Sequence, residues 1–194
     1  MSQINLISFP RSGQHLTERV LRFYCGRKKI KFSYCEFYNH CRTFPCKSKR
    51  KFQKNHDFNL DLPILPEQKY IVLYRNNIEE QIEAYFRFDL KERWGLVHVG
   101  KIEYQDPNKR DQLIKYIHGK TDYYIKFLRK WVFNNNKNIY KIEYNKLLKN
   151  NYLYLKVFNH IFPEIDHKND KKILDMFLKK EKISKKTEIN LDFN

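Results

Sequence analysis

A short turn near the start of the chain has the residue types that can hold a phosphate group. The apolar run at residues 4–9 is followed directly by Pro-Arg-Ser-Gly at residues 10–13, and apolar side chains then recur at helical spacing from Leu16. A glycine-containing turn between a buried strand and a helix presents backbone N–H groups at the positive end of the helix. In this segment alone, an ordinary turn in which Ser12 only caps the helix would look the same.

A histidine and an arginine farther along the chain add a candidate base and a candidate anion-binding group. His56 follows Lys54 and Asn55, and its imidazole titrates near neutral pH and can act as a general base. Arg75 comes directly after the apolar run at residues 70–74, and its planar guanidinium can bind phosphate oxygens through several donors. Taken singly, His56 is one of seven histidines, and Arg75 could be a solvated arginine at a strand end.

Strands that alternate with helices would have to position these groups. The hydrophobic pattern predicts strands at residues 4–9, 70–74 and 139–142, and helices from residue 16 and at 78–88, 109–133, 147–162 and 170–178. Residues 28–51 predict irregular structure with one short helix near residues 34–41, and residues 91–107 predict a loop that could lie over a site. This order is typical of an α/β domain with three layers, α/β/α, around a parallel sheet that binds ligands at the carboxyl ends of its strands.

The length and composition predict one domain with an anionic partner. We expect a single domain over residues 1–180 and a polar, partly disordered tail over residues 181–194. The 39 Lys and Arg against 22 Asp and Glu give a formal charge of +17, which favours a nucleotide, a nucleic acid or a sulfated polymer, although biased composition could produce the same excess. Neither a signal peptide nor an apolar run of membrane-spanning length is apparent, so we expect a cytoplasmic protein without a membrane span.

The four cysteines all lie in the first quarter of the chain, at Cys25, Cys35, Cys41 and Cys46. In a reducing compartment they would normally remain thiols. The last three, with His40 nearby, could form a zinc site, but the chain lacks the paired CxxC spacing of such sites. The sequence therefore favours free structural thiols and predicts no metal.

Three motifs in this order resemble the family of sulfotransferases that use 3′-phosphoadenosine 5′-phosphosulfate (PAPS). The PRSG turn is similar to the family's PRSGxx or PKSGTT loop, which binds the 5′-phosphosulfate of the donor. The Lys-Asn-His segment at residues 54–56 is similar to the KTH or KSH segment that lies shortly before the second nucleotide-binding strand. The strand that ends at Arg75 is similar to the family's strand whose final arginine binds the 3′-phosphate.

The resemblance implies a role for each matched residue. His56 would take the proton from the acceptor hydroxyl, Lys54 would place positive charge against the sulfuryl oxygens, and Arg75 would bind the 3′-phosphate. Arg11 would stabilise charge on the leaving phosphosulfate, since an arginine stays protonated. The remaining loop contacts to the donor would come from Ser12, Gly13, Gln14 and His15, of which Gln14 and His15 replace small hydroxyl residues of the family.

Two positions farther along depart from the family or match it only loosely. Glu83 stands where the family has a serine that completes the 3′-phosphate site, and a carboxylate facing a phosphate would repel it. Either Glu83 turns away and Tyr85 or Arg87 substitutes, or the helix register differs, or selectivity for the 3′-phosphate is weakened. Tyr144, in a segment similar to the family's YEDL, would lie near the adenine, although a buried aromatic after a strand is also a common core residue.

The resemblance thus implies a P-loop-like sulfotransferase fold and transfer of a sulfuryl group from PAPS to a hydroxyl acceptor by in-line displacement, without a metal. The acceptor could be a carbohydrate, a small alcohol, a phenol, a lipid headgroup or a peptide tyrosine, and the oligomeric state is open. One alternative is a P-loop-type phosphoryl transferase, which the absence of GxxxxGK[ST] disfavours. The other is a nucleic-acid-binding or scaffolding protein on a degenerate sulfotransferase fold, which would use the cations and aromatic residues at 28–54 and is less favoured than the enzyme.

Overall fold

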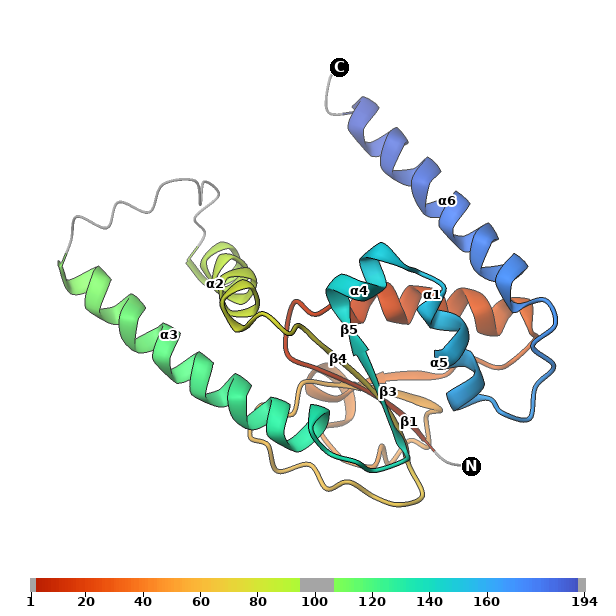
Figure 1. Cartoon of the computed structure of the whole chain (residues 1–194), viewed down its shortest axis with the longest axis horizontal. Helices are drawn as coiled ribbons and strands as arrows, with labels where there is room; N and C mark the ends of the chain where they lie inside the picture. The colour runs from red at the N-terminus through yellow and green to blue at the C-terminus, as the bar shows by residue number, and fades with distance from the viewer. Residues whose placement is uncertain (1–2, 95–106, 192–194) are drawn as a thin grey trace.

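Five parallel strands form the centre of the protein, as a computed structural model of the chain shows (Figure 1). The structure describes residues 3–94 and 107–191, and within them all side chains except those at positions 87, 89–94, 107–113 and 182–191. The sheet has the order β2-β3-β1-β4-β5. Its strands are β1 (Ile4–Ser8), β2 (Tyr34–Glu36), β3 (Phe52–Asn55), β4 (Lys69–Tyr74) and β5 (Ile139–Glu143).

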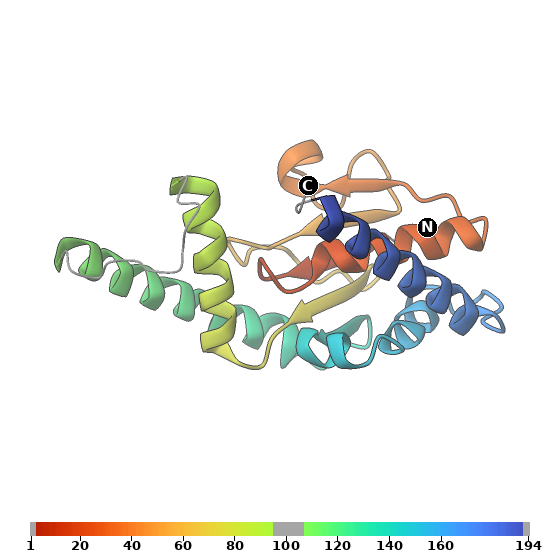
Figure 2. The same cartoon turned by 90° about the horizontal axis from the view of Figure 1, so that it is seen from above.

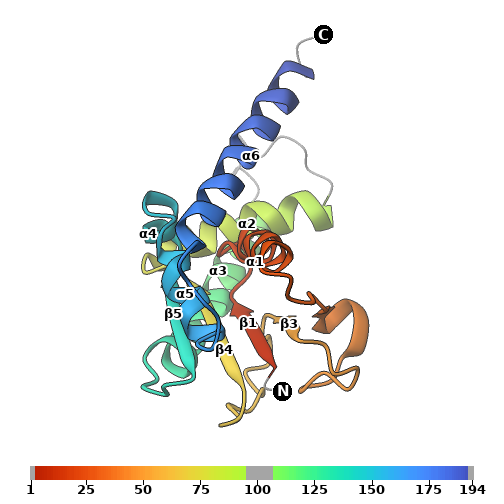
Figure 3. The same ribbon diagram turned by 90° about the vertical axis from the view of Figure 1, so that its right-hand side faces the viewer.

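Helices connect the strands. The α-helices are α1 (Gln14–Arg27), α2 (Ile78–Trp94), α3 (Pro107–Phe127), α4 (Tyr144–Lys149), α5 (Leu153–Ile161) and α6 (Asp170–Leu191), and two short π-helices are η1 (Phe37–Cys41) and η2 (Leu128–Val132). Figure 1 and Figure 3 show α6 extending away from the sheet. Among the helices that the structure describes, none combines the length and the apolar character that a membrane crossing requires.

The two faces of the sheet carry separate cores. Side chains alternate along a strand, so Leu6 of β1 packs with buried residues of α1, α5 and α6, whereas its neighbour Ile7 packs with buried residues of α2, α3 and η2. The aromatic side chains follow the same division: Tyr24 and Phe158 stack on the first face, and Trp131 lies on the second. On the first face, α6 also packs on α1 (Figure 2). Because helices cover both faces of the sheet, the chain has the three-layer α/β/α arrangement that the sequence predicts.

The strand order brings three carboxyl ends together. β1 lies between β3 and β4, with Ile7 opposite Asn55 on one side and Ser8 opposite Leu73 on the other. From β1 the chain first builds the β2–β3 side of the sheet and then the β4–β5 side, so the strand order reverses next to β1. Open parallel sheets bind ligands at this reversal, outside the carboxyl ends of the strands.

The predicted strands at β1, β4 and β5 are confirmed, but the sequence missed β2 and β3. The helix predicted over residues 109–133 is present as α3 followed by η2. The single helix predicted over residues 147–162 is wrong: α4 already begins at Tyr144, and a break at residues 150–152 separates it from α5. Asn150 is extended, with φ −138° and ψ 90°, which ends the first helix.

Two other boundaries differ from the prediction. α2 continues past residue 88 to Trp94, so the first part of the loop predicted at residues 91–107 is helical, and residues 95–106 lie outside the described part of the chain. α6 continues past residue 178 to Leu191, so most of the predicted tail is helical.

Candidate functional site

A cavity of about 850 Å³ lies at the carboxyl ends of β1, β3 and β4. Its walls come from the turn after β1, the residues around the end of β3, the residue after β4, and parts of η1, α2 and α4. Of the residues that the sequence singled out, the cavity is lined by Arg11, Gly13, Gln14, His15, Lys54, His56, Arg75 and Tyr144. The glycine turn, the candidate base and the candidate anion-binding arginine therefore share one cavity.

The turn after β1 needs a glycine at position 13. Gly13 has φ +85°, a left-handed conformation that favours glycine, and a Cβ built there would lie 2.2 Å from Cε2 of Tyr144. Arg11 is also left-handed, with φ 69°. Gly13 is the N-cap of α1, and no described side chain caps this helix end, so Ser12 does not play the simple capping role. The first N–H groups of α1 are therefore the donors that an anion in the turn would meet.

The side chains of Ser12 and Gln14 point into the protein and hold the turn in place. The Ser12 hydroxyl donates to Oε1 of Gln81 at 2.7 Å, and Nε2 of Gln81 donates to the carbonyl of Pro10 at 2.7 Å. Nε2 of Gln14 donates to the carbonyl of Leu6 at 2.7 Å. Contacts from this part of the turn to a ligand would thus come from backbone N–H groups.

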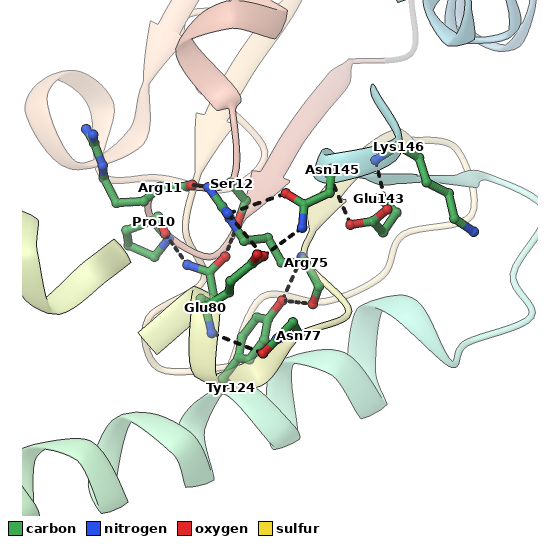
Figure 4. A network of polar contacts seen from close by, with 11 residues as sticks. Pro10, Arg11, Ser12, Arg75, Asn77, Glu80, Tyr124, Glu143, Asn145 and Lys146 are labelled. Carbon is green, nitrogen blue, oxygen red and sulfur yellow. Dashed lines mark hydrogen bonds and ion pairs between the residues drawn. The ribbon is translucent and has the colours of Figure 1, made fainter. Parts of the chain in front are cut away.

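Arg75 lies against the turn in a network of long polar contacts (Figure 4). Its Nη1 lies 3.4 Å from Oε2 of Glu80 and 3.4 Å from Oδ1 of Asn145, and its Nη2 lies 3.4 Å from the carbonyl of Arg11. The guanidinium stands 4.8 Å from the ring centroid of Tyr144. Its Nε is buried and has no hydrogen-bond partner among the described residues, so one donor of the guanidinium is unused.

The surroundings of Arg75 fix its position. The backbone N–H of Arg75 donates to the hydroxyl of Tyr124 at 2.8 Å, and that hydroxyl donates to the carbonyl of Arg75 at 2.6 Å. Asn145 stands at the start of α4, where the carboxylate of Glu143 accepts hydrogen bonds from the backbone N–H groups of Asn145 and Lys146. Both the strand end and the helix start are thus locked around the guanidinium.

His56 has the tautomer that a general base needs. Its Nδ1 lies 2.8 Å from the carbonyl of Ser8, and because a carbonyl can only accept, Nδ1 carries the proton and Nε2 is free to accept one. Burial, with a further contribution from the charge of Lys54, lowers the pKa of His56 to about 4. The imidazole is therefore neutral at neutral pH. The rings of Tyr38 and Phe58 lie beside it, with centroids at 6.4 and 5.2 Å.

The backbone after β3 is anchored so that the imidazole keeps its place. The buried carboxylate of Asp57 accepts from Nζ of Lys130 at 2.7 Å and from Nε1 of Trp131 at 2.8 Å. The hydroxyl of Tyr123 donates to the carbonyl of His56 at 2.9 Å. These bonds tie the residues that follow β3 to α3 and η2.

Lys54 is buried and paired with a carboxylate that the sequence did not single out. Its Nζ lies 2.6 Å from Oε1 of Glu36 and 3.4 Å from Nε2 of His15. Burial alone would raise the pKa of Glu36, but the hydrogen bond and the charge of Lys54 bring that pKa below its ordinary value. Burial and the charge of Lys54 also lower the pKa of His15. Much of the positive charge of Lys54 is thus already balanced by Glu36.

Glu83 is exposed on α2 and is not among the described residues that line the cavity, to which the same helix contributes Ala84 and Phe88. The carboxylate beside Arg75 belongs instead to Glu80. Of the two residues suggested as substitutes, Tyr85 is buried in the core beside Phe9, and the side chain of Arg87 lies outside the described ones.

Sequence reasoning missed the polar partners of the predicted residues, which are Glu36, Glu80, Gln81 and Asn145. They are ordinary polar residues at helix starts or in a three-residue strand, where no periodic pattern marks them. Only Glu80 and Gln81 could have been suspected from the sequence, because they lie in the first turn of the helix predicted directly after Arg75 and are therefore near it in space.

A scan against protein-family models finds no family that matches the chain, and a search of curated proteins finds no matching relative. The likeness to sulfotransferases is therefore carried by the short motifs alone. What the protein does has to be argued from the residues of the cavity.

Proposed function

We propose that this chain is a sulfotransferase with the P-loop-like fold of the PAPS-dependent family, and that it transfers a sulfuryl group from PAPS to a hydroxyl acceptor. The observation that carries the proposal is the convergence of three groups on one cavity: the glycine turn, the neutral imidazole of His56 and the guanidinium of Arg75. The sequence motifs identified these three groups. They meet because β1 lies between β3 and β4, so the carboxyl ends of the three strands lie side by side.

The donor half of the cavity fits an anionic nucleotide. The volume of about 850 Å³ lies in the range of about 300–1,000 Å³ that small-molecule sites occupy. The uncapped start of α1 would bind the 5′-phosphosulfate through backbone N–H groups, with Arg11 neutralising charge on the phosphate. Arg75, with its unpartnered Nε, would bind the 3′-phosphate, and the ring of Tyr144 would face the nucleoside.

The acceptor half fits proton removal. In the proposed reaction the acceptor oxygen bonds to sulfur while its proton passes to Nε2 of His56. The bond between sulfur and the bridging phosphate oxygen breaks, and its electron pair leaves on 3′-phosphoadenosine 5′-phosphate. Lys54, held by Glu36, would direct its remaining N–H groups to the sulfuryl oxygens.

The direct test is isothermal titration of the full chain with 3′-phosphoadenosine 5′-phosphate. We expect one binding site per chain, and we expect AMP, which lacks the 3′-phosphate, to bind about tenfold or more weakly, since a charged hydrogen bond contributes about 1.5–3 kcal/mol. ATP with Mg²⁺ and a single-stranded oligonucleotide serve as comparison ligands. Equal binding of AMP, or binding of the oligonucleotide alone with a steep salt dependence, would overturn the donor assignment.

A further inference from the structure

Three cysteine side chains converge at the β2 edge of the sheet. Cys35 lies on β2, Cys41 ends η1, and Cys46 lies in the segment that follows. Their Sγ atoms all lie within 4.8 Å of one another, and those of Cys35 and Cys41 are 2.9 Å apart. The fourth cysteine, Cys25, is buried separately among the residues of the α1 core.

The surroundings of the three sulfur atoms form an ordered shell. Cys35 and Cys46 are buried and Cys41 is half-buried. Nε2 of Gln53, the residue opposite Cys35 in the neighbouring strand, donates to Sγ of Cys41 at 3.2 Å. The backbone N–H of Cys46 donates to Oε1 of Gln3 at 3.2 Å. An N–H directed at a sulfur stabilises the thiolate that binds a metal, and such outer contacts orient metal ligands.

Three convergent thiols suit a metal ion better than a disulfide, which would use two of them and leave the third beside it. The imidazole of His40, which the sequence offered as a further ligand, is engaged elsewhere, since its Nδ1 accepts from the backbone N–H of Glu36 at 2.9 Å. Cys46 also lines a second cavity, of about 840 Å³, so the cysteine cluster lies beside a space that solvent ions can enter.

We propose that Cys35, Cys41 and Cys46 form a zinc site with three thiolate ligands and a fourth coordination position for a ligand from solution. Zinc accepts such sets of cysteine ligands, at Zn–S distances of about 2.3 Å. Binding would release the three S–H protons to solvent and part the two closest sulfur atoms slightly. This site is independent of the sulfotransferase proposal.

Zinc would also fix one wall of the cavity at the carboxyl ends of β1, β3 and β4. Cys35 is followed directly by Glu36, whose carboxylate pairs with Lys54. In η1, the ring of Tyr38 lies beside His56, and Asn39 lines the cavity. An ion bound to Cys35 and Cys41 would join the two ends of this segment.

The test uses the full chain, reduced and freed of metal with a chelator, and titrates it with Co²⁺ and then with Zn²⁺. We expect one Co²⁺ per chain, with the near-ultraviolet absorption of thiolate-to-cobalt charge transfer, and its displacement by one Zn²⁺. Cys41→Ser and Cys46→Ser should each weaken Zn²⁺ binding by about tenfold or more, as even the loss of an outer-shell partner costs about 10–100-fold. Cys25→Ala, the matched control, should bind within about twofold of the parent.

Several results would overturn the site. One is a folded chain, checked by circular dichroism, that shows no thiolate-to-cobalt band. Another is a Cys25→Ala variant that loses as much affinity as Cys41→Ser. A third is a chain isolated without reductant whose mass is lower by two hydrogen atoms and in which two of the three thiols resist alkylation, because that result assigns the cluster to a disulfide.

Discussion

The cavity at the carboxyl ends of β1, β3 and β4 has two halves, one around Arg75 and one around His56, and their side chains are held in different ways. Around Arg75, the guanidinium makes three polar contacts to described residues, each 3.4 Å long, and its Nε has no hydrogen-bond partner among those residues. Around His56, the Nδ1 contact to Ser8 is 2.8 Å, and the nearby pair of Lys54 and Glu36 is 2.6 Å. Hydrogen bonds weaken as they lengthen, so the first group can exchange its partners more easily than the second.

This difference suits the two tasks that we propose for Arg75 and His56. A binding group has to leave its internal partners when the ligand arrives, and long contacts make that exchange inexpensive. A general base has to keep one tautomer and one orientation through every turnover, and short contacts with an anchored backbone provide that. The variants below separate the half formed by Arg75 and the turn from the half formed by His56 and Lys54.

Removal of His56, the proposed base, should have the largest effect. We expect His56→Ala to lower the rate of sulfuryl transfer from PAPS by about 10²–10⁴, the usual contribution of general acid–base catalysis, while 3′-phosphoadenosine 5′-phosphate binds within about twofold of the parent. Transfer is followed by release of that product with a panel of phenol, sugar and alcohol acceptors. His118→Ala, which removes an exposed histidine of α3, is the control. Full transfer by His56→Ala would remove His56 from the mechanism.

Removal of the guanidinium should act on binding. We expect Arg75→Ala to weaken 3′-phosphoadenosine 5′-phosphate by about 10–100-fold, because charged hydrogen bonds of about 1.5–3 kcal/mol are lost, and to leave AMP almost unaffected. Arg75→Lys should keep part of the affinity, since a lysine retains the charge but not the planar donor set. Titration calorimetry with both nucleotides measures this. An equal loss for AMP would show that Arg75 does not meet the 3′-phosphate.

The pH profile distinguishes the buried imidazole from an exposed one. Burial lowers the pKa of His56 to about 4, so its unprotonated form persists down to about pH 5. If this form is the base, as we propose, kcat/KM should fall about tenfold per pH unit only below pH 4. Because the pKa of a histidine in the unfolded chain is near 6.5, the unfolded state binds a proton first, and the stability of the fold also declines as pH falls from 6.5 to 4. The rates are therefore measured where circular dichroism shows a folded chain. An inflection near pH 6.5 would contradict the buried base.

The smallest effect concerns the carboxylate beside Arg75. Glu80 would compete with a bound phosphate for the guanidinium, so Glu80→Gln should strengthen binding of 3′-phosphoadenosine 5′-phosphate by about 1.4- to fivefold, the range of an exposed ion pair of about 0.2–1 kcal/mol. Glu79→Gln, on the same helix and also exposed, should change the affinity less. Weaker binding by Glu80→Gln would mean that Glu80 helps to position Arg75 for its ligand.

The sequence predicted the donor half better than the acceptor half. Residues 70–74 are a continuous apolar run and residues 4–9 are mostly apolar, and such runs mark strands that are buried on both faces. β3 reads Phe-Gln-Lys-Asn and shows no such run, although all four of its residues are buried. Two of its polar side chains bond partners in another part of the chain, Lys54 with Glu36 and Gln53 with the carbonyl of Thr43, and the local sequence pattern carries no information about those contacts.

Within the site, too, the sequence predicted residues that belong to a motif and did not predict contacts that depend on packing. It identified Arg11, His56 and Arg75 because their types and order resemble a family motif, and the parallel sheet then brings them together. It did not anticipate that Gln14 would turn inward, and it could not choose among the alternatives for Glu83, of which the structure has Glu83 turned away from the cavity. The orientation of a helix around its own axis depends on its packing against the sheet, which the local sequence does not reveal.

The central claim is that both halves belong to one site, and a nitrogen-15 NMR titration with 3′-phosphoadenosine 5′-phosphate tests it most directly. The resonances to follow are Nε2 of His56 and Nε–H of Arg75, assigned with the His56→Ala and Arg75→Lys variants. We predict that both resonances shift along curves with a single Kd. A shift of only one resonance, or two curves with different Kd values, would contradict a shared site.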